Sequence, residues 1–159
     1  MLILFEHPLS PYAQKVKIAL YEKGIPFEAK TPDLFGQTEQ AFLDSSPRRE
    51  VPSLVDDGFT VFDSTIILEY LEDRFPEPRL LPPTPQDRAR VRMLEEICDT
   101  YYEAINWGMA EILVFGRAQG ELAQQMTARA AEQTAGLHRW LERELGAREW
   151  FNGAAFGWG

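Results

Sequence analysis

Residues 76–85 contain five prolines in ten positions, and this short segment constrains the fold more than any other part of the chain. Proline fixes its own φ angle and lacks a backbone N–H, so neither a helix nor an inner strand can run through such a segment. We therefore expect a stiff, extended linker over residues 77–85. Residues 1–76 and 86–159 should fold as two domains on either side of it.

The first 76 residues alternate between short apolar runs and amphipathic helical patterns. Four strands are expected, at residues 2–5, in "IPFEAK", in "VPSLV" and in "FTVF", the last two joined by an Asp-Gly turn. Helices are expected from Pro11 to Gly24, around residues 38–43, and from Ser64 to Pro76. The order βαβαββα defines an α/β domain.

The residues after the linker carry only helical patterns. Apolar side chains recur at steps of three and four from Val91 to Ile112, which predicts one long helix over about residues 86–117. A second helix is expected over about residues 121–145, with three leucines facing inward, Leu137, Leu141 and Leu145. Two helices leave much apolar surface uncovered, so this all-helical C-terminal domain looks incomplete, with further helices expected after Gly159.

The charged residues, 16 Lys and Arg against 25 Asp and Glu, give a net charge of −9. Nucleic acid is therefore not expected as a main partner, although a single basic pocket for an anion is permitted. The lone Cys98 excludes a disulfide within the chain and fits a reducing compartment. "MLILF" is too short for a signal sequence and no run could span a bilayer, so we expect a cytoplasmic protein without a membrane partner. His7 and His138 are isolated, so no metal is expected.

Serine precedes proline at the start of the first helix. Ser10 suits the N-cap and Pro11 the first helical position, where a missing N–H costs nothing. A hydroxyl at the positive end of a helix can also stabilise an anion. The two interpretations are compatible.

Asp63 and Ser64 stand at the start of the third expected helix. In one interpretation Ser64 is the cap and Asp63 a favourable charge near the helix dipole. In the other, Ser64 and the helix N–H groups hold a carboxylate while Asp63 takes the ammonium group beside it. Such a pair of charges is found on an amino-acid head group.

Pro52 stands at the start of an expected strand, where it cannot donate a ladder hydrogen bond. It either interrupts the start of the strand or forms a cis peptide bond with Val51. A cis bond would leave the N–H and C=O of Val51 free to pair with a peptide-like ligand.

Together these features resemble the cytosolic glutathione transferase family, in its serine-type classes. The most specific stretch is "VPSLVDDGFTVFDSTIILEYLEDRFP", and "SPYAQKVKIALYEKGIPFE" supports it. The resemblance implies a thioredoxin-like N-terminal domain that binds glutathione as co-substrate. It also implies a helical domain that forms most of the pocket for a small hydrophobic electrophile, and a homodimer.

The resemblance also assigns roles to single residues. Ser10 matches the residue that activates the thiol, and the backbone of Val51 matches the group that pairs with the cysteinyl part of glutathione. Pro52 matches the family's cis proline, and Asp63 with Ser64 matches the pair that holds the γ-glutamyl head. The ending "FNGAAFGWG" resembles the approach to the family's N-capping motif in the central helix of its C-terminal domain.

The sequence departs from the family pattern at two of these places. Asp63 replaces the usual Glu or Gln, and its carboxylate reaches about one methylene less far. Glu50 replaces the usual Gln or Lys, and its charge repels the carboxylates of glutathione. Arg49, or its neighbour Arg48, is expected to compensate by pairing with the glycine carboxylate.

Three aromatic side chains are candidates for the electrophile pocket, although aromatic residues at helical spacing are more often part of a core: Tyr12, Tyr102 and Trp107.

The expected function is a cytoplasmic glutathione transferase of the detoxifying kind. One alternative is a non-enzymatic regulator of the stringent starvation protein type, which the chain resembles around "EYLEDRFPEP" and which binds a protein partner. Another alternative, a thiol–disulfide oxidoreductase, would need cysteine where Ser10 stands.

Overall fold

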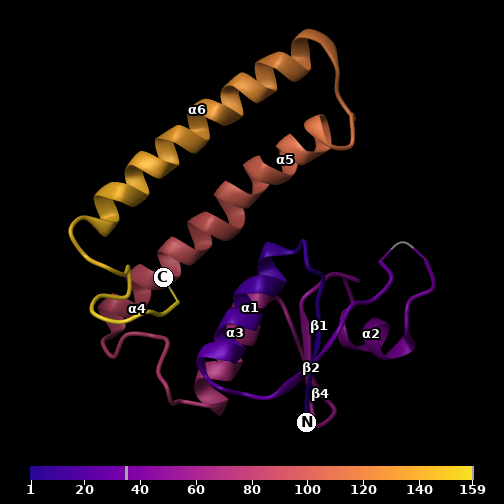
Figure 1. The fold of residues 1–159 in the computed structure, drawn as a ribbon, viewed down its shortest axis with the longest axis vertical. Coiled ribbons are helices and arrows are strands. Elements are labelled where there is room, and N and C mark those ends of the chain that lie inside the picture. Colours follow the sequence, from indigo (N-terminus) through magenta and orange to yellow (C-terminus); the bar gives the residue numbers. More distant parts are fainter. Residues whose placement is uncertain (35, 159) are drawn as a thin grey trace. The chain divides into compact units, whose positions relative to one another are not determined.

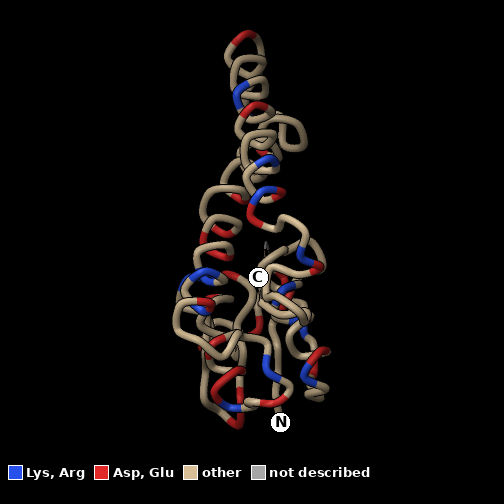
Figure 2. Tube along the Cα trace, turned by 90° about the vertical axis from the view of Figure 1, so that its left-hand side faces the viewer, with Lys and Arg blue, Asp and Glu red and all other residues tan. Residues whose placement is uncertain are grey.

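The structure is a computed structural model, and it describes residues 1–34 and 36–158 of the chain. It divides into two units, Met1–Leu80 and Leu81–Gly159 (Figure 1). Basic and acidic residues are interspersed along the trace of both units (Figure 2). In the described residues no helix is long and apolar enough to cross a membrane.

The first unit is built on a four-stranded sheet with the strand order β2-β1-β3-β4. Its strands are β1 (Leu2–Phe5), β2 (Phe27–Lys30), β3 (Ser53–Asp56) and β4 (Phe59–Phe62). β1 pairs parallel with β2 and antiparallel with β3, which pairs antiparallel with β4. Asp57 and Gly58 join β3 to β4 with φ angles of 47° and 90°, as the tight hairpin turn requires.

Three helices cover this sheet: α1 (Pro11–Glu22), α2 (Gln40–Ser45) and α3 (Ser64–Arg74). α1 and α3 lie against one face of the sheet and α2 lies on the other (Figure 1). Both helices of the pair bury an apolar stripe, made of Ala13, Val16, Ala19 and Leu20 in α1 and of Ile67, Leu68 and Leu71 in α3. The element order confirms the predicted βαβαββα pattern.

The C-terminal ends of α1 and α3 are joined by a buried ion pair. Lys23 Nζ lies 2.7 Å from Glu72 Oε2, and the lysine side chain is only 1% exposed. The same ammonium group donates to the carbonyl oxygens of Phe75, at 2.8 Å, and Pro78, at 2.9 Å. The Glu72 carboxylate in turn accepts the N–H of Leu80 at 3.2 Å. This cluster fixes the chain that follows α3.

The second unit contains α4 (Pro85–Glu96), the π-helical segment η1 (Ile97–Tyr102), α5 (Glu103–Leu113) and α6 (Gly120–Leu145). α5 and α6 run side by side in opposite directions (Figure 1). The single regular helix predicted over residues 86–117 is wrong in two respects. It is interrupted by η1, and it ends at Leu113, because Phe115 N–H bonds to Ala110 C=O and Gly116 then takes a φ of 63°.

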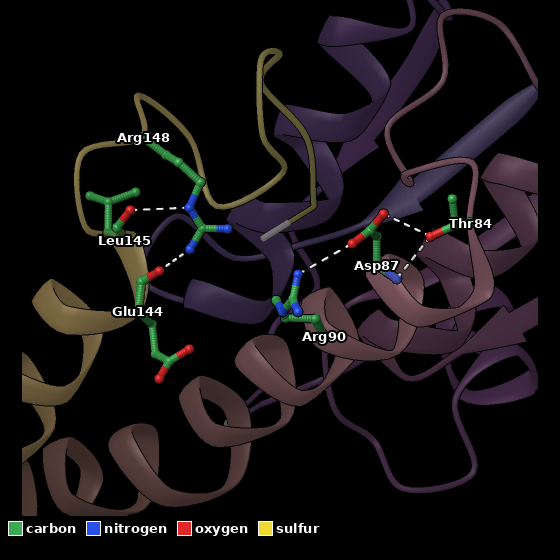
Figure 3. Close-up of polar contacts among 6 residues, drawn as sticks. All are labelled: Thr84, Asp87, Arg90, Glu144, Leu145 and Arg148. Atoms are coloured by element: carbon green, nitrogen blue, oxygen red, sulfur yellow. Dashed lines mark hydrogen bonds and ion pairs between the residues drawn. The ribbon is translucent and has the colours of Figure 1, made fainter.

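Polar contacts mark the start of α4 and the end of α6 (Figure 3). Thr84 Oγ1 caps α4 by accepting the N–H of Asp87 at 3.2 Å, and donates to the Asp87 carboxylate at 2.7 Å. Asp87 also pairs with Arg90 at 3.2 Å. After α6, the Arg148 guanidinium donates to the carbonyl groups of Glu144 and Leu145. These contacts fix the two ends locally.

The apolar faces of the second unit are only partly covered in the structure. Of the three leucines predicted to face inward from α6, Leu137 is buried while Leu141 and Leu145 are half-buried. Cys98 is half-buried within η1. Two consecutive tyrosines of η1 reach α6: Tyr101 Oη lies 3.5 Å from Gln133 Nε2, and Tyr102 Oη lies 3.3 Å from His138 Nε2.

Candidate functional site

The register of the sheet brings the predicted site segments to one edge. Phe5, Ser53 and Phe62 lie in line across β1, β3 and β4. Phe5 ends β1 and leads toward Ser10, Ser53 follows the Val51–Pro52 bond, and Phe62 ends β4 directly before Asp63. Segments that are distant in the sequence therefore enter or leave the sheet at the same edge.

Ser10 is the N-cap of α1, as predicted. Its backbone is extended, with φ −86° and ψ 112°, and its Oγ accepts the N–H of Ala13 at 3.2 Å. Pro11 occupies the first helical position. Because the cap bond uses a lone pair of Oγ, the hydroxyl hydrogen is left to donate to another acceptor. The half-buried side chain can therefore cap the helix and bind a ligand at the same time.

The cap of α3 is Asp63, so the interpretation in which Ser64 is the cap is wrong. Asp63 Oδ1 accepts the N–H of Thr65 at 3.1 Å and that of Ile66 at 3.4 Å. Asp63 has a φ of 72°, a left-handed conformation that Asp tolerates better than most residues. Ser64 is the first helical residue and is 5% exposed. Both cap bonds use the same carboxylate oxygen.

The Val51–Pro52 peptide bond is cis, as predicted. Pro52 is buried and lies directly before β3, while Val51 is half-buried and lies outside the ladder. Within the described residues neither the N–H nor the C=O of Val51 makes a hydrogen bond. A half-buried residue with both main-chain groups unpaired can pair with a ligand.

Three charged residues precede Val51. The carboxylate of Glu50 lies 2.5 Å from the guanidinium group of Arg48, and both side chains are exposed. This ion pair offsets the negative charge that was expected to repel an anionic ligand. Arg49 is also exposed, and its φ of 55° is in the left-handed region.

The three aromatic candidates for a substrate pocket lie in different units. Tyr12 is the second residue of α1 and is half-buried. Tyr102 belongs to η1 and contacts His138. Trp107, on α5, is 57% exposed, with its ring centroid 6.1 Å from that of Phe115.

Two polar contacts near this edge of the sheet could not be predicted from the sequence. Lys15 Nζ lies 3.3 Å from Thr65 Oγ1 and links the N-terminal halves of α1 and α3. Glu6, buried just after β1, pairs with Lys17 at 3.4 Å. Both contacts form only in the packed fold. The sequence places the two lysines on a helix but does not indicate their partners. In the described part of the chain, no group of three or more His, Cys, Asp or Glu side chains is placed to hold a metal ion.

Comparison with known proteins places this arrangement in a family. Residues 4–79 match the model for the N-terminal domain of glutathione S-transferases. A probable glutathione S-transferase of rice, GSTU1 of Oryza sativa subsp. japonica, is 35% identical over 98% of this chain and 67% of its own length. The chain therefore belongs to the glutathione S-transferase family.

Solved structures agree with this assignment. The crystal structure of rice GST1 in complex with glutathione superposes with a TM-score of 0.86 and 34% identity, over 99% of this chain and 70% of that one. The similarity confirms a thioredoxin-like N-terminal domain followed by a helical region. A stringent starvation protein A homologue of Coxiella burnetii is 37% identical over a shorter region, 59% of this chain and 44% of its own length. The chain spans about two thirds of the length of its plant relatives.

Proposed function

We propose that this protein is a glutathione transferase that binds glutathione at the edge of the sheet and activates its thiol with Ser10. The observation that carries the proposal is the register across Phe5, Ser53 and Phe62, which gathers the three site segments. Membership of the family and the glutathione in the complex of the rice relative support the choice of ligand.

The protein needs only to favour the ionised form of the glutathione thiol. A free thiol has a pKa near 8.5, so at neutral pH it is mostly protonated, whereas the thiolate is the nucleophile. A hydroxyl that donates a hydrogen bond to sulfur, at the positive end of α1, lowers the pKa of the bound thiol. Each unit by which the pKa falls corresponds to about 1.4 kcal/mol. Ser10 stabilises the thiolate and need not act as a base.

The remaining groups bind the rest of the tripeptide. The N–H and C=O of Val51, beside the cis Pro52, pair with the cysteinyl part. Ser64 and the start of α3 hold the γ-glutamyl carboxylate, and the second carboxylate oxygen of Asp63 takes the ammonium group, because the cap bonds use only Oδ1. Arg49 pairs with the glycine carboxylate.

The second substrate is a small hydrophobic electrophile. The reaction suits detoxification in the cytoplasm by a homodimer, without a metal ion.

Retention on immobilised glutathione, with elution by free glutathione, tests the proposal together with conjugation of a generic aromatic electrophile. We expect retention and conjugation that increases with pH. Failure to bind would overturn the proposal and favour the alternative, a non-enzymatic regulator, for which the similarity to the stringent starvation protein A homologue is the supporting observation.

A further inference from the structure

We propose that Ser46 is a positioning residue, whose buried hydroxyl orients the backbone of Val51 for binding the cysteinyl part of glutathione. The inference rests on the proposed function, because it concerns the same docking group. It goes further by assigning the orientation of that group to a side chain that does not itself touch the ligand.

The Ser46 hydroxyl makes two hydrogen bonds to a single residue. It accepts the N–H of Glu50 at 3.1 Å and donates to the C=O of Glu50 at 2.9 Å. The C=O of Ser46 also accepts the N–H of Arg49 at 3.0 Å. Ser46 itself is 1% exposed, so water competes poorly for these bonds. Ser46 therefore fixes the loop that precedes Val51 through three hydrogen bonds.

The carbonyl group of Glu50 and the N–H of Val51 belong to the same planar peptide unit. In a trans peptide unit these two groups point in opposite directions. The bond from Ser46 to the Glu50 carbonyl therefore fixes the Val51 N–H so that it points away from Ser46. Loss of the bond would free this peptide plane to rotate, and the direction of the docking group would no longer be set before the ligand binds.

Ser45 provides a matched comparison within the same segment. It is as buried as Ser46, and its hydroxyl donates to the C=O of Phe42 at 2.9 Å and lies 2.8 Å from Ser53 Oγ. Ser53, however, already pairs with both β1 and β4. Its position does not depend on Ser45, so the Ser45 hydroxyl contributes to stability without orienting the docking group.

The test compares wild type with Ser46→Ala, Ser45→Ala and Ser46→Thr, using calorimetry with glutathione and steady-state kinetics. We expect Ser46→Ala to weaken glutathione binding about tenfold, the size expected for the loss of a buried pair of hydrogen bonds. The KM for glutathione should rise while the KM for the electrophile stays unchanged. Ser45→Ala should keep wild-type affinity. Ser46→Thr should restore it, because the extended backbone of Ser46, with φ −134° and ψ 95°, accepts a β-branched residue.

Amide hydrogen exchange gives a second readout that does not need ligand. The Glu50 amide should be protected in wild type and in Ser45→Ala, and should exchange much faster in Ser46→Ala. Wild-type protein that binds glutathione, with unchanged affinity or unchanged Glu50 exchange in Ser46→Ala, overturns this inference alone. Wild-type protein that does not bind glutathione overturns the proposed function and, with it, this inference.

Discussion

The two ends of the α1–α3 pair differ in how their polar groups are satisfied. The helices run parallel, since Lys15 meets Thr65 near their starts and Lys23 meets Glu72 near their ends. At the C-terminal end, the Lys23 ammonium group has three partners within the protein. At the N-terminal end, Ser10 and Asp63 cap the helices and keep a hydroxyl hydrogen and a carboxylate oxygen for other bonds.

The difference separates stability from binding within one pair of helices. A closed polar cluster stabilises the fold because each buried group already has its partner. A binding site needs groups that are fixed in place and still have bonding capacity. The positive ends of both helix dipoles favour an anion at the open end. A lysine at the C-terminal end of α1 is favourable for the same electrostatic reason.

Breaking the closed end should give the largest loss of stability. Lys23→Ala leaves the Glu72 carboxylate buried without its counter-charge, and should lower the free energy of unfolding by about 3–5 kcal/mol. Chemical denaturation measures this loss, and Lys15→Ala, which removes the 3.3 Å contact between Lys15 Nζ and Thr65 Oγ1, should cost about 1 kcal/mol or less. A comparable loss in both variants would contradict the distinction between the two ends.

Removing the hydroxyl at the open end should affect turnover more than stability. In the proposed function, Ser10→Ala would lose a hydrogen bond to a charged sulfur, worth about 1.5–3 kcal/mol, or about 10- to 150-fold in conjugation rate at neutral pH. The apparent pKa in the pH–rate profile should rise, while unfolding costs only about 1 kcal/mol for the lost cap.

The matching variant Ser10→Cys places a thiol at the same helix start. It should lose conjugation and gain thiol-transferase activity through mixed disulfides with glutathione. An unshifted pH profile in Ser10→Ala, with no new activity in Ser10→Cys, would leave Ser10 as a cap alone.

Two substitutions of Asp63 separate its cap from its charge. Asp63→Ala removes the oxygen that accepts both N–H groups and places alanine at a left-handed φ, so stability should fall by about 2 kcal/mol. Asp63→Asn keeps an acceptor oxygen and tolerates the same φ, so unfolding should change by less than about 0.5 kcal/mol. Both variants should bind glutathione more weakly in calorimetry. Wild-type affinity in Asp63→Asn would show that the charge does not contact the ammonium group.

A hydrogen bond from the middle of α3 to β3 should give the smallest loss of stability and a distinctive pH dependence. Tyr70, on α3, donates to Asp56 on β3 at 2.7 Å, and burial, followed by this bond, raises the pKa of the phenol. Tyr70→Phe should cost about 1 kcal/mol at neutral pH.

The sign of the alkaline effect follows from the raised pKa. The stabilisation by the neutral phenol is complete below the unfolded-state pKa of about 10, and is lost as the pH rises through the higher folded-state value. Chemical denaturation at a series of pH values, from neutral to alkaline, should show the difference in free energy of unfolding between wild type and Tyr70→Phe becoming smaller. A constant difference across that range would contradict the role of the phenol.

Local patterns were sufficient for most of the first unit and for the cap at Ser10. The strands there are short and apolar, and the Asp-Gly turn and Gly24 mark element ends in the sequence itself. At α3 the same reasoning gave Ser64 as the cap in one of two interpretations, because Asp63 and Ser64 are both good capping residues. The choice depends on the φ of Asp63, which the fold sets when β4 leads into α3.

Most of the contacts that could not be predicted from the sequence exist only because the packed fold brings the residues together. Lys23 and Glu72 belong to different helices, and only the packed α1–α3 pair brings them together. The Ser46 hydroxyl acts on a nearby residue, yet its role depends on the path of a loop that has no regular period. In the second unit, steps of three and four fit a regular helix, and the π-helical segment η1 leaves no trace in that pattern.

That π-helical segment also sets the directions in which its own side chains point. An α-helix turns about 100° per residue, whereas η1 fits extra chain into one wider turn. Deleting a single residue from η1 would close the wide turn into a regular α-helical turn, with the phase of α5 relative to α4 nearly unchanged. The side chains carried by the wide turn itself, Tyr101 and Tyr102 among them, would change direction, so the spacing within η1 is a length constraint on any relative that keeps their contacts with α6.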